Sequence, residues 1–435
     1  MAKHLYYNVV IAGCGVAGLY TALNLPSETR ILMLCKEDLE SCDSMLAQGG
    51  ICVLHDEQDY DSFFEDTMKA GHYENRKESV DIMIRSSRQI IDHLLDLGVR
   101  FDSNPDGSLQ YTREGAHSRP RICFHEDITG KEITTTLQRH VRALPNVTIM
   151  EYTTMTDILT EAGTRQDAAE RSPFGTSADS RTIGVAAKTD GLFYCTGIIA
   201  ASAKGETLYI HSHDTVMATG GIGGLYEHST NFPCLTGDAL EIAKKHGVEL
   251  EHTDYVQIHP TSLYSGKPGR SFLITESARG EGAVLLNSKK ERFVNELLPR
   301  DVVTQAILQE MKKEGTSHVW LSFAAVSEET IKNHFPHIYE KCLEEGYDIT
   351  KEPIPVVPAQ HYFMGGVHVD SNSETTMKHL YAVGETSCNG VHGRNRLASN
   401  SLLESLVFAK RAADKITAGQ KGSFKHESNY HAACC

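Results

Sequence analysis

The 435-residue sequence has no long apolar run, and this absence excludes a large class of proteins. No uninterrupted apolar stretch approaches the roughly 18 residues that a membrane-spanning helix requires. The apolar N-terminus runs into Asn8 and a glycine loop, which fits a first β-strand better than a secretory signal. We therefore expect a cytoplasmic protein with no membrane partner.

Paired cysteines and an excess of basic charge are also missing. The 11 cysteines are scattered without a C-x-x-C pair, a pattern typical of reduced thiols and not of a disulfide framework or a zinc site. Lysine and arginine number 42 against 57 acidic residues, and the formal net charge of −15 argues against nucleic acid as a partner. With 40% hydrophobic residues, the chain is long enough for two or three globular domains.

A phosphate-binding turn is present near the N-terminus. A β-branched apolar run leads into Gly13-Cys14-Gly15-Val16-Ala17-Gly18, and a helix-forming segment and a second strand, 30–35, follow. In such a motif the glycines permit a tight turn, close approach of backbone N–H groups to a pyrophosphate, and close packing of helix on strand. The acid expected after the second strand for NAD binding is replaced by Cys35-Lys36. The motif therefore predicts a dinucleotide and leaves FAD open.

Two loops carry further signals. Residues 41–51 are small and include a Gly-Gly pair, which suits a loop lying against a flat ligand or a phosphate. Residues 111–121 combine three arginines with His117 and Glu114. This second loop is either a solvated charge cluster or a site where cations bind carboxylates and Glu114 binds an amine. Farther along, residues 161–181 are rich in small polar residues, and we expect a mobile insertion there.

Alternation of period two predicts short strands at 193–200 and 207–210, and a separate strand at 215–218 that runs into glycines. Beyond them, histidines, arginines and a Thr-Glu pair recur between 257 and 396, each flanked by glycine or proline loops. Any one of these histidines alone is more often structural than catalytic. The spacing fits no metal site, because it lacks H-x-x-x-H and cysteine pairs. A cation-rich set without a metal predicts binding of a dicarboxylate.

Seven motifs in combination resemble those of the succinate dehydrogenase/fumarate reductase flavoprotein family. They lie at 13–18, 47–50, 218–221, 259–261, 279–282, 361–366 and 392–404, and the resemblance covers nearly all of residues 5–417. It implies an α/β fold in which a Rossmann-like FAD-binding domain is interrupted by a smaller α+β capping domain, with the active site between them. We expect the FAD-binding domain at 1–255 plus 364–417 and the cap at 256–363. Residues 418–435 are expected to form a disordered polar tail, in place of the C-terminal helical domain of many relatives.

Within that family, the sequences of the loop at 112–118 and of the segment at 397–404 resemble those of the aspartate-oxidising members. The resemblance implies FAD-dependent oxidation of L-aspartate to iminoaspartate, with hydride passing to flavin N5 and reoxidation by O₂ or fumarate. That reaction is the first step of de novo NAD biosynthesis, and the implied partner is quinolinate synthase, which receives iminoaspartate. Two features leave a soluble fumarate reductase as the alternative. The motif His-x-x-Met-Gly-Gly at 361–366 resembles that of fumarate reductases, and Arg394 would add a cation near the substrate arginine. A non-catalytic FAD-binding regulator is disfavoured by the catalytic set in the cap.

The resemblance also implies individual roles for residues of the active site. Arg300 would shuttle a proton and Glu114 would bind the substrate amino group. The catalytic residues implied are Arg300, Glu114, His259, His361 and Glu276, and the substrate-binding residues are Thr275, Arg396, His259 and His361.

The cofactor residues follow from the same resemblance, and no metal is implied. Membrane-bound relatives link the flavin covalently to a histidine, and Asp43 stands at that position here, so FAD is expected to be held non-covalently. The residues implied to bind it are Gly13, Gly15, Val16, Ala17, Gly18, Lys36, Ser44, Ala47, Gln48, Gly49, Gly50, Met155, Thr219, Gly220, Asp238, Glu385, Ser401 and Leu402.

Overall fold

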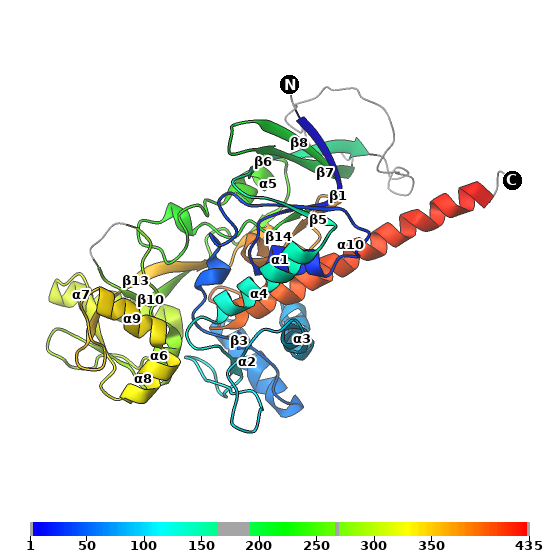
Figure 1. Cartoon of the computed structure of the whole chain (residues 1–435). Helices are drawn as coiled ribbons and strands as arrows, with labels where there is room; N and C mark the ends of the chain where they lie inside the picture. Colours follow the sequence, from blue (N-terminus) through cyan, green and yellow to red (C-terminus); the bar gives the residue numbers. More distant parts are fainter. Residues whose placement is uncertain (1–2, 164–191, 266–268, 433–435) are drawn as a thin grey trace.

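The computed structural model describes residues 3–163, 192–265 and 269–432, with side chains of the last helix as far as Gln420 (Figure 1). The insertion predicted at 161–181 lies almost wholly outside the described residues. Its first three residues, 161–163, end a β-strand.

A seven-stranded sheet forms the centre of the larger domain. Strand β1 lies in its middle and pairs in parallel with β2 on one side and β8 on the other. Its residues Val9 to Ala12 are buried on both faces, as expected for a central parallel strand. The strands, in sheet order, are β5 (Val147–Met150), β2 (Ile31–Leu34), β1 (Lys3–Ala12), β8 (Thr207–Met217), β7 (Leu192–Ala201) and β6 (Thr154–Gly163), with β15 (Leu380–Ala382) pairing β8.

Strand β8 differs from the sequence expectation of two separate strands. It is continuous from Thr207 to Met217 because it pairs with β1 along its whole length, from Lys3 opposite Leu208 to Ala12 opposite Met217. The polar residues 211–214 in its middle interrupted the apolar pattern and concealed this continuity.

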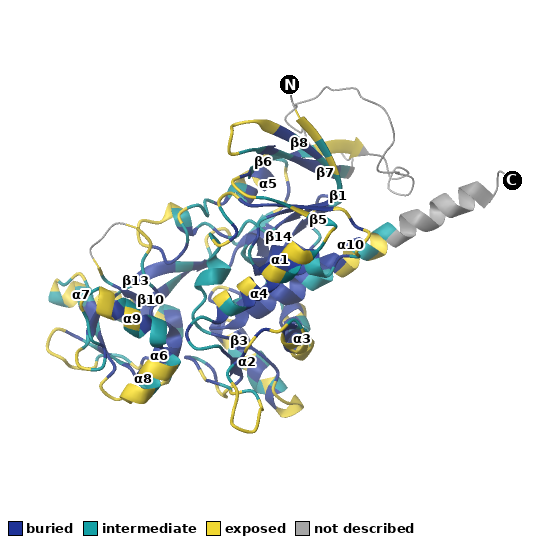
Figure 2. Ribbon diagram, in the orientation of Figure 1, coloured by how far each residue is buried: buried dark blue, intermediate teal, exposed yellow. Residues whose placement is uncertain are grey.

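Helices cover both faces of the sheet, and burial decreases from the sheet outward (Figure 2). One face carries α1 (Val16–Leu23), α2 (Tyr60–Ala70), α3 (Lys77–Asp96), α4 (Thr129–Ala143) and α10 (Asn400–Ala432), and the other carries α5 (Asp238–Lys245). Small strands complete this domain: β3 (Ile51–Cys52) with β4 (Ile122–Cys123), and β9 (Leu250–Glu251), β14 (Gly366–His368) and β16 (Ser387–Cys388).

A second sheet with its own core lies beside the first (green to orange in Figure 1). All of its strands lie between 256 and 363, the segment assigned to the cap from the sequence. Its strands, in sheet order, are β10 (Val256–Leu263), β13 (Ile354–Phe363), β12 (Val319–Ser322) and β11 (Val284–Leu286), and its helices are α6 (Glu276–Gly280), α7 (Arg300–Glu314), α8 (Glu328–His334) and α9 (Pro336–Glu344).

The last helix, α10, continues through residues 418–432, where the sequence analysis predicted a disordered tail. No proline occurs between Asn400 and Ala432, so nothing in this segment removes a backbone donor or forces a kink. Among the described residues, no helix is both long and apolar enough to cross a membrane.

Candidate active site

A deep cleft runs from the carboxyl ends of the central strands to the second sheet, the usual position for a ligand in an open α/β sheet. The ends of β1, β2, β8 and β15 border it on one side, and residues of the second sheet close its far end. Its empty volume is about 1710 Å³, including the part open to solvent. This space is large enough for an extended cofactor together with a small substrate.

At one end of the cleft the glycine motif forms a narrow turn. Gly13 has a φ of +116°, and a Cβ built on it would lie 1.9 Å from the carbonyl oxygen of Ala218. A Cβ on Gly18 would lie 2.2 Å from the Gly13 carbonyl, so Gly18 serves the packing of α1 against β1. The Val16 N–H donates to Ser44 Oγ at 3.1 Å, which ties the glycine turn to the loop at 41–51. There is no space for a side chain at Gly13 or Gly18, so backbone N–H groups of this turn can approach a pyrophosphate closely.

Lys36 and Asp238, both implied to bind the cofactor, pair with each other at this end of the cleft. The Lys36 ammonium lies 2.9 Å from Asp238 Oδ2 and 2.8 Å from Thr236 Oγ1. Lys36 and Asp238 are partly exposed, so the pair is one of modest strength.

The middle of the cleft contains buried polar atoms without a partner among the described residues. Asp43 accepts a hydrogen bond from the Phe232 N–H at 2.8 Å through Oδ1, whereas its Oδ2 and Gln48 Oε1 have none. Burial raises the pKa of Asp43 to about 7. Burial, together with the charge of Asp43, raises the pKa of Glu385 to about 8. Unpaired buried polar groups are costly, so these residues fit a bound polar ring system such as the isoalloxazine of FAD.

At the far end, two buried arginines bind one glutamate, and a third buried arginine, Arg396, lies beside them. Arg300 Nε donates to Glu276 Oε2 at 2.5 Å, and Arg279 lies 3.5 Å from Glu276 Oε1. Burial opposes ionisation of Glu276, but Arg300 and Arg279 outweigh it and hold its pKa below the usual value. Gln257 Oε1 accepts from Arg300 Nη1 at 2.8 Å and from Arg396 Nε at 3.3 Å. A single neutral side chain thus joins two arginines that repel each other.

Of these three arginines, Arg396 is the one that has no carboxylate partner among the described residues. It donates to Ser401 Oγ, and its guanidinium lies 4.1 Å from the centre of the Tyr362 ring. Burial and the neighbouring charge of Arg300 lower its pKa to about 10. An anion bound here would relieve both penalties.

Two histidines implied as substrate ligands lie together beside the arginines. The rings of His259 and His361 are 5.1 Å apart and nearly perpendicular. Burial, and then the arginine charges, lower the pKa of both rings well below the usual value, so they are neutral. His361 Nδ1 lies 2.7 Å from Thr230 Oγ1, and His259 Nε2 has no partner among the described residues. Neutral rings of this kind can donate to a carboxylate without adding charge.

Glu114 lies at the same end of the cleft and is buried. Its Oε1 accepts from Ser277 Oγ at 2.7 Å, and its Oε2 accepts from Ser399 Oγ at 2.6 Å. Burial, and then the charge of Glu276, raise the pKa of Glu114. Hydrogen bonds from the two serine hydroxyls favour the ionised form of Glu114 and oppose this rise in its pKa. Thr275 caps the N-terminus of α6 and so positions Ser277.

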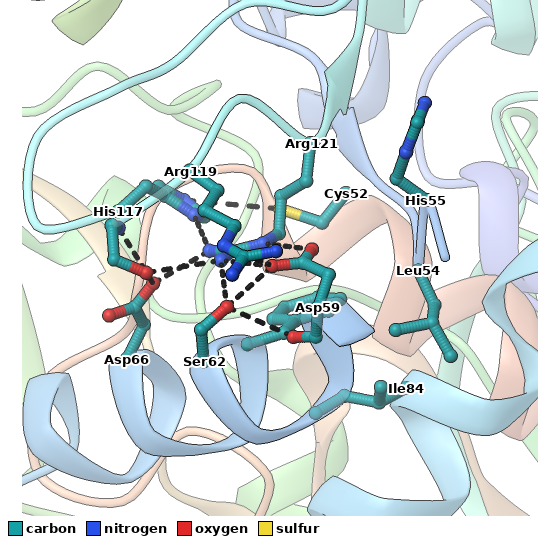
Figure 3. Close-up of polar contacts among 12 residues, drawn as sticks. Cys52, Leu54, His55, Asp59, Ser62, Asp66, Ile84, His117, Arg119 and Arg121 are labelled. Carbon is teal, nitrogen blue, oxygen red and sulfur yellow. Dashed lines mark hydrogen bonds and ion pairs between the residues drawn. The ribbon is translucent and has the colours of Figure 1, made fainter. Parts of the chain in front are cut away.

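The loop that carries Glu114 is fixed by a buried arginine, and the close-up in Figure 3 shows this contact. Arg121 is fully buried and binds Asp59 through two hydrogen bonds of 2.8 and 2.9 Å, and Asp66 through one of 2.7 Å. His117 Nδ1 lies 2.9 Å from Arg121 Nη1, and burial together with Arg121 lowers the pKa of His117 to about 4. Arg121 therefore anchors the loop to α2.

Of the two interpretations left open for this loop, binding of substrate carboxylates does not hold for Arg121, which is paired with Asp59 and Asp66, or for Arg119, which points to Asp59 at 3.9 Å. Loop charge alone could not reveal that their partners lie on the neighbouring helix. The prediction that Arg394 adds a cation near Arg396 is also wrong. Arg394 is 63% exposed, lies near Glu74 and does not line the cleft.

The cleft brings the other predicted residues together. Every residue implied to act in catalysis or to bind substrate lines it, as does every implied cofactor residue except Gly18.

Two further residues of the cleft end were not assigned roles from the sequence. Gln257 bridges two arginines although it is neutral, and only its position two residues before His259 hinted at it. Arg279 stands three residues after Glu276, a spacing that places both on one helix face. The spacing of Glu276 and Arg279 could be recognised in the sequence, whereas the contact of Gln257 with two arginines could not.

Fold and cleft together define an FAD-binding flavoprotein of the succinate dehydrogenase and fumarate reductase type. The model of the FAD binding domain family matches residues 8–402. An E. coli quinol fumarate reductase superposes with a TM-score of 0.83 at 28% identity, covering 99% of this chain and 74% of that one. Sdh1 of Mycobacterium smegmatis gives 0.73 at 29% identity, covering 96% and 70%.

Curated proteins with similar sequences show higher identity to this chain than these structures do. L-aspartate oxidase of Clostridium perfringens is 46% identical over 410 residues, which cover 94% of this chain and 86% of that protein. L-aspartate oxidase of Pseudomonas aeruginosa is 38% identical over 428 residues, covering 95% and 75%. The chain belongs to the L-aspartate oxidase family, and its cofactor is FAD.

The Arg121 anchor gives a test of stability. Asp59→Ala leaves the fully buried guanidinium of Arg121 with only one of its two carboxylate partners, Asp66. We expect the free energy of unfolding to fall by about 3–5 kcal/mol. Asp61→Ala, an exposed residue on the same helix, is the matched control and should change it by less than about 0.5 kcal/mol. Denaturant unfolding of the FAD-loaded proteins measures both. Equal, small effects would show that the anchor does not stabilise the loop.

Proposed function

We propose that this protein oxidises L-aspartate to iminoaspartate. The observation that carries the proposal is the position of Glu114, a buried carboxylate at the same end of the cleft as Arg300 and Arg396. Aspartate presents two carboxylates and one ammonium group. The arginines suit the carboxylates, and Glu114 suits the ammonium.

The charge of the cleft end supports an amino acid substrate. Arg279, Arg300 and Arg396 carry three positive charges, and Glu114 and Glu276 carry two negative charges. The neighbouring histidines are neutral. Glu276 is held by Arg300 and Arg279, whereas Glu114 pairs with two serine hydroxyls and no arginine, so its charge is available for an ammonium group, which aspartate has and fumarate lacks.

In the proposed reaction the protein binds, orients and moves a proton. When bound, FAD supplies the acceptor for the hydride that leaves Cα of aspartate. Arg396, His259, His361 and Thr275 hold the carboxylates, and Glu114 holds the amino group and fixes which face of Cα is presented. Arg300 is the proton shuttle of the catalytic set, and Glu276, 2.5 Å from it, is the group that exchanges a proton with it.

Fumarate reduction is the second candidate function. The similarity to quinol fumarate reductase and the absence of any need for Glu114 in that reaction keep it open. Fumarate could also act as the electron acceptor for aspartate oxidation, with O₂ as the other acceptor. Aspartate oxidation would be the first step of de novo NAD biosynthesis. We further propose that its product, an imine that water hydrolyses, passes directly to quinolinate synthase. The nine described cysteines are all free thiols, which agrees with a cytoplasmic location.

FAD is proposed to be bound without a covalent link, because Asp43 stands where relatives carry the linking histidine and a carboxylate forms no such bond. Acid precipitation of the purified protein should release all of the flavin into the supernatant, measured by absorbance. Flavin that stays with the pellet after washing would refute the proposal.

Glu114→Gln tests the substrate. A charge-assisted hydrogen bond contributes about 1.5–3 kcal/mol, and glutamine loses most of it, so kcat/KM for aspartate should fall roughly tenfold or more. Fumarate reduction by the same variant, with reduced dye as donor, should be nearly unchanged because fumarate has no amine. The two serines can still hydrogen-bond the amide, so the fold should persist.

The matched control is Glu281→Gln, because Glu281, the residue after α6, pairs with His334 at 3.5 Å and does not line the cleft. Both activities should survive in it. Equal loss of both reactions in Glu114→Gln would show that Glu114 is structural. Wild-type protein that reduces fumarate but does not oxidise aspartate would favour the second candidate.

Arg300→Lys and Arg396→Lys separate proton transfer from binding. Both changes keep the positive charge and alter the donor geometry. Arg300→Lys should lower kcat for fumarate reduction far more than it raises KM, because that reaction needs a proton at carbon. Arg396→Lys should act mainly through KM. A change in KM alone for Arg300→Lys would make Arg300 a second carboxylate ligand and not the shuttle.

A further inference from the structure

A compact group of metal-ligating side chains lies outside the cleft, and no step of the proposed reaction uses it. His213 and Asp214 belong to β8, and His379 directly precedes β15. His213 Nδ1 lies 2.7 Å from Asp214 Oδ2, and His379 Nδ1 lies 3.0 Å from Asp214 Oδ1. One ligand atom from each residue lies within 4.8 Å of the others, and none of the three residues lines the cleft.

The sheet topology explains why these residues meet. Strand β8 pairs with β7 as far as His211 opposite Gly197, and with β15 from Thr215 opposite Leu380. Asp214 falls in the interval between the two partners. Its side chain therefore lies where the pairing of β8 with β7 has ended and its pairing with β15 has not begun, and both imidazoles reach it there.

The backbone of His379 supports a specific role for its ring. It has a φ of +63°, in the left-handed region that glycine adopts freely and histidine does not. The conformation is held by the Thr215 N–H, which donates to the His379 carbonyl at 2.9 Å. A histidine in a position suited to glycine turns its ring toward a buried carboxylate.

Burial and donor chemistry fit a divalent transition-metal ion. Asp214 is 3% exposed, whereas His213 and His379 are 19% and 34% exposed, so solvent reaches the site from the imidazole side. Two imidazole nitrogens and one carboxylate oxygen are ligands that Zn²⁺ accepts, with water in the fourth position. We propose that His213, Asp214 and His379 form a binding site for a Zn²⁺-type ion, distinct from the active site.

The position of the ion gives it a structural consequence. It would join β8 to the start of β15, and both strands lead into loops of the FAD cleft. Thr219 and Gly220 follow β8, and Gly384 and Glu385 follow β15. Occupancy should therefore stabilise the edge of the sheet that carries the cofactor.

Metal titration of the full-length, FAD-loaded protein tests the site. A histidine tag, if used, is removed, and metals are stripped with a chelator before Co²⁺ or Zn²⁺ is added. Wild-type protein should bind one Co²⁺ per chain more tightly than its remaining histidines do, with ligand-field absorption at longer wavelengths than the flavin bands. Zn²⁺ should displace it and raise the unfolding temperature.

Two variants probe the ligands, and one serves as control. His379→Gly should weaken binding at least about 100-fold and abolish the stabilisation by Zn²⁺, while folding normally because glycine suits its φ. Asp214→Asn removes the charged ligand and should have a similar effect. His211→Gln is the control: His211 lies on the same strand but pairs with His4 at 3.0 Å, so binding should persist.

Two results would overturn the proposed site: wild-type binding no tighter than that of His379→Gly, or equal loss in His211→Gln. Stoichiometric binding without any change in unfolding temperature would overturn the proposed structural consequence of the ion. None of these outcomes depends on aspartate or fumarate turnover, so the test is independent of the proposed function.

Discussion

The balance of buried charge at the end of the cleft is the constraint on which the site depends. Arg279, Arg300 and Arg396 are removed from water and would be strongly destabilising if left unpaired. Glu276 forms ion pairs with Arg279 and Arg300. Arg396 instead contacts Gln257, Ser401 and the face of the Tyr362 ring. Because Arg396 comes from the FAD-binding part and Arg300 from the second sheet, this balance also links the two parts of the molecule. The cleft end is complete only when an anion joins it.

Rigid supports outside the cleft keep this balance in place. Arg121, with Asp59 and Asp66, fixes the loop of Glu114 to α2, and two serines then fix the carboxylate itself. A carboxylate positioned from both sides has little freedom to turn away from an incoming ammonium group. Such preorganisation is the usual way in which binding sites reduce the cost of ordering side chains when a ligand arrives.

The sequence predicted those features that are encoded locally. The glycine turn was predicted from a short-range pattern of strand, glycines and helix. The class of fold, which the resemblance to the flavoprotein family implied, is confirmed by the family match and the superposition with fumarate reductase. Strand β8 was divided in two because residues 211–214 are polar, and the strand they pair with, β1, lies near the N-terminus, far away in the sequence. The pairing of Arg121 with Asp59 spans 62 residues, and that of Asp214 with His379 spans 165. Charge patterns show that a partner is needed and do not show which residue provides it.

The neutral histidines have a consequence for how the site responds to pH. Burial and the adjacent arginines lower the pKa of His259 and His361 well below the usual value, so neither ring gains a proton as the pH falls through the ordinary histidine range. The positive charge that receives a dicarboxylate is therefore supplied by arginines, which stay protonated. Of the two glutamates at this end of the cleft, Glu276 has a lowered pKa, whereas burial and then the charge of Glu276 raise the pKa of Glu114, so Glu114 loses its charge before Glu276 on acidification. Recognition of the ammonium group is thus more sensitive to acid than recognition of the carboxylates, which separates the two halves of substrate binding by their electrostatics.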